Sequence, residues 1–340
     1  MHLFSRRNQT VFKRLLLILV ILLAVGLLVS VGLYFYLQRY LVYTQDGVYL
    51  DFHRDRIEEP GSDVPEGPAY DFSDAQIEEV ELAVPGTEIS STVLTGYRVP
   101  HELLRDPQAL LAFCDTLDGP CTLLFDAKDS VGNFFFPSNV SGQGDQSGDL
   151  LSTLVPVLKR RGFYLVARVS AFRDRSYGLS NVSTGLPLVS GALWMDSGGC
   201  YWLDPANTAV QLRLVRMCTE LFDLGFHEVV LGNFFFPSTD KIIYRAEEGR
   251  DAVVARAAAD LADALTGIGA VSFQITDNQT LFSPGSGRLY YEAESASGLE
   301  GILSQIDGLL ESPDAQLVFI TDSHDTRFEG YGLLRTMQPE

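Results

Sequence analysis

Three charged side chains, Asp126, Lys128 and Asp129, lie close together in the segment FDAKDSVG, directly after the apolar run CTLLF. Carboxylates at such a strand end can act as general acid, base or nucleophile in reactions on a sugar. Asp126 and Asp129 are therefore candidate catalytic residues, and Lys128 is a candidate substrate ligand. The sequence leaves open a structural alternative, an ion pair between Asp126 and Lys128.

Later segments supply further polar candidates. Glu292 in YYEAES and Asp322 in FITDSHD also follow apolar runs and are candidate catalytic carboxylates. Arg168 stands inside the apolar run LVARVS, where a charge needs a partner of opposite sign. Arg168 and the nearby Asp174 are candidate substrate ligands.

The loop SGALWMDSGGCYWLDPANT holds both tryptophans of the chain, Trp194 and Trp202, each followed two residues later by an aspartate, Asp196 and Asp204. Indole faces can stack on pyranose rings, while carboxylates accept hydrogen bonds from sugar hydroxyls. All four are candidate carbohydrate ligands. Two structural alternatives stay open: Trp202 as a plug beneath the loop, and Asp204 as part of the start of the helix that follows.

These candidates are positioned by alternating elements. From about residue 92, short apolar segments alternate with longer amphipathic ones, a pattern typical of a parallel sheet covered by helices. The predicted strands are TVLTGYRV, CTLLFDAK, FYLVARVS, FHEVVLGNF, AVSFQIT, RLYYEAE and QLVFITDS, with YGLLRTM as an eighth.

The length of this region decides between two architectures. Residues 92–340 match the length of one (β/α)8 TIM-like barrel, whose strand ends meet on a single rim. We expect such a barrel, either closed or incomplete at its C-terminus. An open doubly wound sheet is the second choice, because no GxGxxG follows the first strand.

The heptapeptide GNFFFPS occurs twice, at Gly132–Ser138 and Gly232–Ser238. The flanking sequences do not match each other, which argues against a duplication. Each copy begins at or just beyond a predicted strand end, so both belong to the same rim of the barrel. Asn233, in the second copy, is a further candidate ligand.

The first forty residues differ from the rest. Leu15–Leu37 has no charged residue and is long enough to cross a bilayer as a helix. Basic residues are concentrated before it, which predicts a cytoplasmic N-terminus. We expect a cytoplasmic tail at 1–14, a signal-anchor helix at 15–37, a lead-in at 38–90 and an extracytoplasmic barrel at 91–340. A processed signal peptide is the alternative.

The composition excludes some partners. The formal net charge is −19, which disfavours nucleic acid, and there is no basic patch. No phosphate-binding loop, dinucleotide fingerprint or metal-ligand motif is present, so we expect neither a cofactor nor a metal. The four cysteines allow disulfides or buried free thiols.

From Thr92 to about Pro237 the chain resembles a bacterial family of predicted TIM-barrel glycoside hydrolases. The resemblance lies in FDAKDSVG, GFYLVARVSAFRD, the LW and YW loop, and LGFHEVVLGNFFFP. It implies a barrel that acts on polysaccharide. The family carries an Asp at the end of the fourth strand and an Arg three residues later, but this chain has Gly232 and Phe235 there.

This departure leaves three hypotheses. The leading one is a membrane-anchored barrel that binds cell-envelope or extracellular polysaccharide and has lost catalysis. The second is an active glycoside hydrolase that uses Asp126 and another rim carboxylate. The third is an envelope scaffold without a glycan role. A pair of carboxylates across the mouth at the spacing of a hydrolase would favour the second, and two fully buried tryptophans would favour the third.

Overall fold

A computed structural model of the chain describes residues 41–44, 47–50, 93–140, 149–244, 248–277 and 279–338. The chain divides into two compact units, residues 1–78 and 79–340. In the first unit, β1 (Leu41–Thr44) and β2 (Gly47–Leu50) pair as an antiparallel hairpin. The predicted membrane span lies outside the described residues. Within the part that is described, no helix is both long and apolar enough to cross a membrane.

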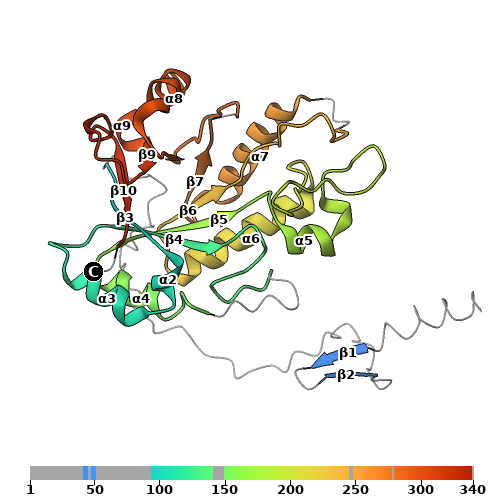
Figure 1. Cartoon of the computed structure of the whole chain (residues 1–340), viewed down its shortest axis with the longest axis horizontal. Helices are drawn as coiled ribbons and strands as arrows, with labels where there is room; N and C mark the ends of the chain where they lie inside the picture. Colours follow the sequence, from blue (N-terminus) through green and yellow to red (C-terminus); the bar gives the residue numbers. More distant parts are fainter. Residues whose placement is uncertain are drawn as a thin grey trace, which may run out of the picture. The chain divides into compact units, whose positions relative to one another are not determined.

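The second unit contains a closed barrel of eight parallel strands, in the order β10-β3-β4-β5-β6-β7-β8-β9 (Figure 1). The strands are β3 (Thr95–Val99), β4 (Thr122–Lys128), β5 (Tyr164–Ser170), β6 (Glu228–Gly232), β7 (Ala270–Ile275), β8 (Leu289–Glu292), β9 (Leu317–Ile320) and β10 (Gly332–Thr336). All eight strand predictions are confirmed. Because β10 pairs with both β9 and β3, the incomplete barrel and the open sheet are wrong.

Helices follow most strands. They are α2 (His101–Leu104), α3 (Pro107–Asp115), α4 (Leu154–Arg160), α5 (Arg175–Ser180), α6 (Thr208–Leu224), α7 (Arg250–Ala264), α8 (Leu299–Ile306) and α9 (Pro313–Gln316). The longest, α6, begins where Asn207 accepts a hydrogen bond from the Ala209 amide, and it ends at Gly225 with φ 121°. A capping amide and a terminal glycine are the sequence signals expected at these two ends.

The strands bury side chains on both faces, as the sequence predicts for a parallel sheet. One set of alternating residues fills the barrel interior: Leu124, Val166, Val230, Tyr290, Val318 and Leu334. The other set packs outward against the helices in a larger apolar core. Cys114, Cys121, Cys200 and Cys218 are all free thiols, so the structure forms no disulfide among them.

An ion pair fills the end of the barrel where the strands begin. Glu228, the first residue of β6, lies 2.7 Å from Arg288, which precedes β8, and both side chains are fully buried. The hydroxyls of Tyr164 and Tyr290 also donate to Glu228. This end is therefore plugged by a satisfied polar cluster, and the opposite end is left for function.

We predict that Arg288→Met lowers the free energy of unfolding by about 3–5 kcal/mol, because the charge of Glu228 is then buried without a partner. Urea unfolding measures this. The double variant Glu228→Gln/Arg288→Met, which removes both charges, should recover much of the loss. A single variant as stable as the wild type would contradict the role given to the pair.

Candidate functional site

The mouth of the barrel, where the strands end, holds a bidentate ion pair. The Arg168 Nε of β5 lies 2.5 Å from the Asp126 Oδ1 of β4, and its Nη2 lies 3.0 Å from Oδ2. The Arg168 side chain is only 11% exposed, which strengthens its need for a counter-charge. The partner that the sequence required for this buried arginine is therefore Asp126.

Glu292 of β8 joins the same network. Its Oε2 lies 3.2 Å from Arg168 Nη1 and 3.3 Å from Gln274 Nε2, and its Oε1 lies 2.8 Å from Arg98 Nη1. Arg98 also lies 3.5 Å from Asp126. The mouth thus brings together two carboxylates that were expected to be catalytic, and the guanidinium of Arg168 contacts both.

Sequence reasoning missed two members of this network, Arg98 and Gln274. Both stand on strands at positions that alternate with apolar residues, Arg98 in TGYRV and Gln274 in AVSFQI. Arg168 has the same placement in LVARVS, so the signal was present in the sequence. A polar side chain in an apolar strand, near its carboxyl end, marks the mouth of a barrel.

The charges hold Asp126 in its ionised form. Burial alone would raise the pKa of Asp126, but the neighbouring Arg168 and Arg98 outweigh it and keep the pKa below the ordinary value. At neutral pH this carboxylate can accept hydrogen bonds from sugar hydroxyls or act as a base. It does not carry the proton that a general acid must donate.

Gly232, the last residue of β6, also faces the mouth. A methyl group at this position would lie 3.1 Å from Gln274 Oε1 and 3.9 Å from Arg168 Cδ. A carboxylate here would therefore stand beside Arg168. The next residue, Asn233, has φ 51° and donates from Nδ2 to Ser170 Oγ at 2.9 Å, so its amide is tied to the end of β5.

A cavity of about 560 Å³ opens beside the network and is lined in part by Arg98, Glu292, Glu294 and Asp322. The predicted residue Asp322 therefore shares a cavity with Glu292. Its Oδ1 accepts a hydrogen bond from the Thr336 amide at 2.7 Å. Three carboxylates and one arginine thus line this side of the mouth.

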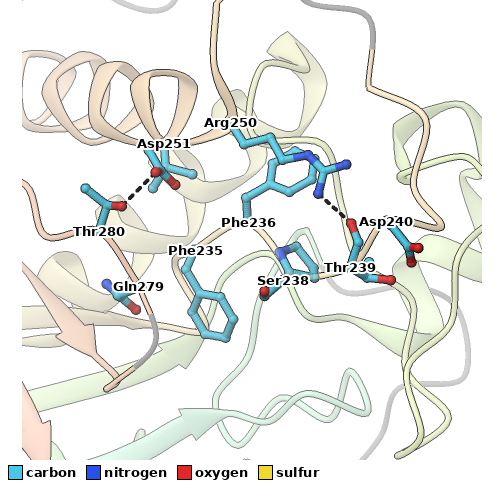
Figure 2. A pocket seen from close by; sticks show the side chains of 11 residues that line it. Phe235, Phe236, Ser238, Thr239, Asp240, Arg250, Asp251, Gln279 and Thr280 are labelled. Atoms are coloured by element: carbon cyan, nitrogen blue, oxygen red, sulfur yellow. Dashed lines mark hydrogen bonds between the residues drawn. The ribbon is translucent and has the colours of Figure 1, made fainter.

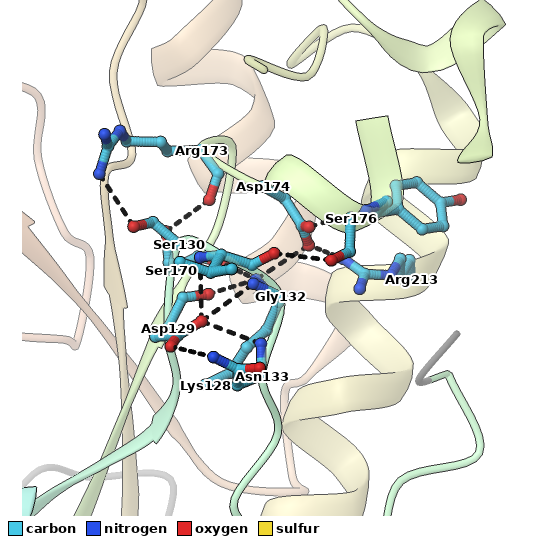
Figure 3. Close-up of polar contacts among 12 residues, drawn as sticks. Lys128, Asp129, Ser130, Gly132, Asn133, Ser170, Arg173, Asp174, Ser176 and Arg213 are labelled. Atoms are coloured by element: carbon cyan, nitrogen blue, oxygen red, sulfur yellow. Dashed lines mark hydrogen bonds and ion pairs between the residues drawn. The ribbon is translucent and has the colours of Figure 1, made fainter. Parts of the chain in front are cut away.

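Lys128 and Asp174 lie in a separate, enclosed cluster (Figure 3). The pairing of β4 with β5 shifts register between Asp126 and Lys128. Lys128 Nζ therefore lies 2.9 Å from Asp174 Oδ2, and Arg213 Nη1 lies 3.0 Å from the same oxygen. The alternative of an Asp126–Lys128 ion pair is wrong. Both Lys128 and Asp174 are fully buried, so neither reaches a ligand in this structure.

Asp129 organises the loop that carries the first GNFFFPS. Its Oδ1 accepts hydrogen bonds from the amides of Val131, Gly132 and Asn133, each at 2.9 Å, and its Oδ2 accepts from Asn133 Nδ2 at 2.7 Å (Figure 3). These bonds occupy both oxygens. Asp129 therefore shapes the rim, while Asp126 faces the mouth.

Asp196 fixes the tryptophan loop. It accepts hydrogen bonds from Arg173 Nε at 2.6 Å and from Trp202 Nε1 at 2.9 Å. Trp202 is 5% exposed, as its alternative role of a plug predicts, whereas Trp194 is half-buried and lies 6.2 Å from it between ring centroids. Asp204 accepts from the Ala206 amide near the start of α6, as its structural alternative predicts.

The two GNFFFPS segments use their aromatic rings differently. Phe134, Phe135 and Phe136 of the first copy are all buried. In the second copy only the first ring, Phe234, is fully buried, while Phe235 and Phe236 are half-buried and line a cavity of about 810 Å³ (Figure 2). The repeated sequence therefore serves packing in one place and a surface cavity in the other.

The described residues contain no group of three or more His, Cys, Asp or Glu side chains suited to hold a metal ion.

Comparison with known proteins gives one family match. A family described as "Putative glycosyl hydrolase domain" matches residues 110–274. The resemblance inferred from the motifs is confirmed over this part of the chain. The match supports a carbohydrate-related function. No curated protein matches the chain.

Several solved structures are similar. A hypothetical protein from Ruminiclostridium thermocellum ATCC 27405 is 18% identical with a TM-score of 0.43, over 51% of this chain and 91% of that one. The glycoside hydrolase domain of PelA from Pseudomonas aeruginosa is 16% identical with a TM-score of 0.45, over 72% and 94%. The alpha-galactosidase TtGalA from Thermus thermophilus is 13% identical with a TM-score of 0.46, over 73% and 58%.

We predict that Asp174 makes the barrel acid-sensitive. Burial would raise its pKa, but Lys128 and Arg213 keep the pKa below the ordinary value of 3.8. The stabilisation is therefore present above pH 3.8 and is lost as the pH falls through the lower, folded-state value. Asp174→Asn should be less stable at pH 7 by about 3–5 kcal/mol, because two buried cations lose their partner.

Urea unfolding between pH 7 and pH 3 tests this. The wild type should lose stability more steeply than Asp174→Asn at the acid end. Asp118→Asn, at an exposed position, is the matched control. Identical acid slopes for the wild type and Asp174→Asn would contradict the assignment.

Proposed function

We propose that this protein is a membrane-anchored, extracytoplasmic barrel that binds carbohydrate at its mouth without hydrolysing it. Its ligand is a cell-envelope or extracellular polysaccharide. The family match over residues 110–274 supports a carbohydrate ligand. The anchor and its orientation rest on the uncharged run Leu15–Leu37 and the basic residues before it.

The proposed loss of catalysis rests on one observation: the guanidinium of Arg168 contacts both mouth carboxylates, Asp126 and Glu292. Glycoside hydrolysis by two carboxyl groups requires one protonated acid and one ionised partner on either side of the scissile bond. In this mouth a cation joins the two groups, and Asp126 is held ionised. The arrangement suits hydrogen bonding to hydroxyls better than proton transfer.

One observation favours the second hypothesis, that of an active hydrolase. Asp126 and Glu292 do converge on the mouth from different strands, as a catalytic pair would. In that case a substrate would have to displace Arg168 from one of them. The release of reducing ends from a bound polysaccharide distinguishes the two hypotheses.

We predict binding without release. The full-length protein in detergent, tested against a panel of envelope and plant polysaccharides, should bind at least one of them and release no reducing ends. Trp194→Ala should weaken binding by about 2- to 10-fold, the loss expected for one aromatic contact. Leu212→Ala, at an exposed position on α6, is the control. Reducing-end release that disappears in Asp126→Asn would establish the hydrolase instead.

We also predict that a carboxylate at position 232 restores some turnover. In Gly232→Asp the new side chain would displace the end of Gln274 and meet Arg168. Reducing ends should then be released from the bound polysaccharide at a rate at least about tenfold above the wild-type background. Gly232→Asn has the same shape without the charge and should release none. Equal release from both variants would refute the role given to the missing carboxylate.

A further inference from the structure

The second cavity, of about 810 Å³, lies between the loop after β6 and the loop after β7 (Figure 2). It is built by Phe235–Asp240, which includes most of the second GNFFFPS, together with the first turn of α7 and with Gln279 and Thr280. Its volume falls within the range of ordinary ligand sites. None of the residues proposed for the mouth network lines it, so it is a distinct place on the molecule.

An aromatic ring forms one surface of this cavity. Phe235 is half-buried, and its ring packs 4.9 Å from that of Trp202, which in turn lies 6.2 Å from Trp194. Trp202 is held in place by its hydrogen bond to Asp196. The ring of Phe235 therefore packs against a fixed aromatic neighbour and gives the cavity an apolar surface.

The only arginine among the residues that line this cavity is already committed. Arg250 Nη1 donates to the Thr239 carbonyl at 2.6 Å and Nη2 donates to the Ile242 carbonyl at 2.9 Å. Its guanidinium also stacks over Phe236 at 4.8 Å (Figure 2). Arg250 thus serves as a wall of the cavity and offers little to an anionic ligand.

The remaining polar groups are hydroxyls, an amide and carboxylates. Thr280 donates to Asp251 at 2.6 Å, both among the lining residues, and Asp240 and Ser238 are exposed lining residues (Figure 2). Carboxylates and hydroxyls recognise ligand hydroxyls, and the carboxylates repel a ligand carboxylate. The apolar ring of Phe235 and these polar groups together suit an uncharged ligand ring that carries several hydroxyls.

We infer that this cavity is a second carbohydrate subsite, which binds a neutral pyranose with its apolar face on Phe235 and its hydroxyls toward Asp240, Asp251 and Thr280. The inference rests on the proposed function and extends it, because it assigns a ligand class and a location away from the mouth. It also gives the second GNFFFPS a function: the loop that replaced the family's strand-end residues forms the subsite.

Filling the cavity tests this without removing any core contact. Ser238→Trp places an indole at an exposed edge residue, and Ser304→Trp, at an exposed position on α8, is the matched control. The probes are the neutral hexasaccharides cellohexaose, maltohexaose and chitohexaose, with hexagalacturonate as the charged analogue. Calorimetry on the full-length protein in detergent measures their affinities.

We expect at least one neutral hexasaccharide to bind more tightly than hexagalacturonate. Its affinity should fall at least about tenfold in Ser238→Trp, because the indole fills the cavity. Its affinity should not change in Ser304→Trp. If a hexasaccharide binds equally well to Ser238→Trp and the wild type, the subsite is refuted and the proposed function stands. If hexagalacturonate binds more tightly, the neutral ligand class is wrong. If no hexasaccharide and no polysaccharide of the panel binds, both the subsite and the proposed function fall.

Discussion

The barrel depends on supplying counter-charges to cations buried inside it. Arg168, at 11% exposure, takes Asp126 and Glu292, while Arg288 takes Glu228 at the opposite end. Lys128 and Arg213 share Asp174 beneath the rim loops. A buried charge without a partner would lower the free energy of unfolding by several kcal/mol. Each of these carboxylates is therefore paired with a cation. In the proposed function, the pairing of Arg168 with both Asp126 and Glu292 accounts for the absence of hydrolysis.

The two GNFFFPS segments show how one short sequence serves two purposes on one rim. In the first copy, Asp129 orders the turn and the three phenylalanines pack inward. In the second, Gly232 lets Gln274 approach the end of β6 closely, and Phe235 packs against Trp202 and lines the outer cavity. The glycine at the strand end and the phenylalanine that lines the outer cavity thus belong to the same segment.

Much of this architecture could be predicted from the sequence, because parallel strands buried on both faces leave a readable apolar pattern. Closure by β10 required a pairing between residues about 240 positions apart, Leu333 with Thr95, which no local pattern reports. The bulge that separates Asp126 from Lys128 is equally invisible, so their partners were not assigned. The burial of Trp202 depends on Asp196 and Phe235, whose positions follow from tertiary packing. Arg98, by contrast, could have been found from its place in an apolar strand.

At the mouth, Arg168 and Arg98 hold the carboxylate of Asp126 ionised. Carbon-13 NMR titration of aspartate-labelled protein, with Asp126 identified by its loss in Asp126→Asn, measures the pKa of this group directly. We expect a pKa below the ordinary aspartate value of 3.8. A pKa of about 6, as a catalytic acid would have, would contradict it and would favour an active hydrolase.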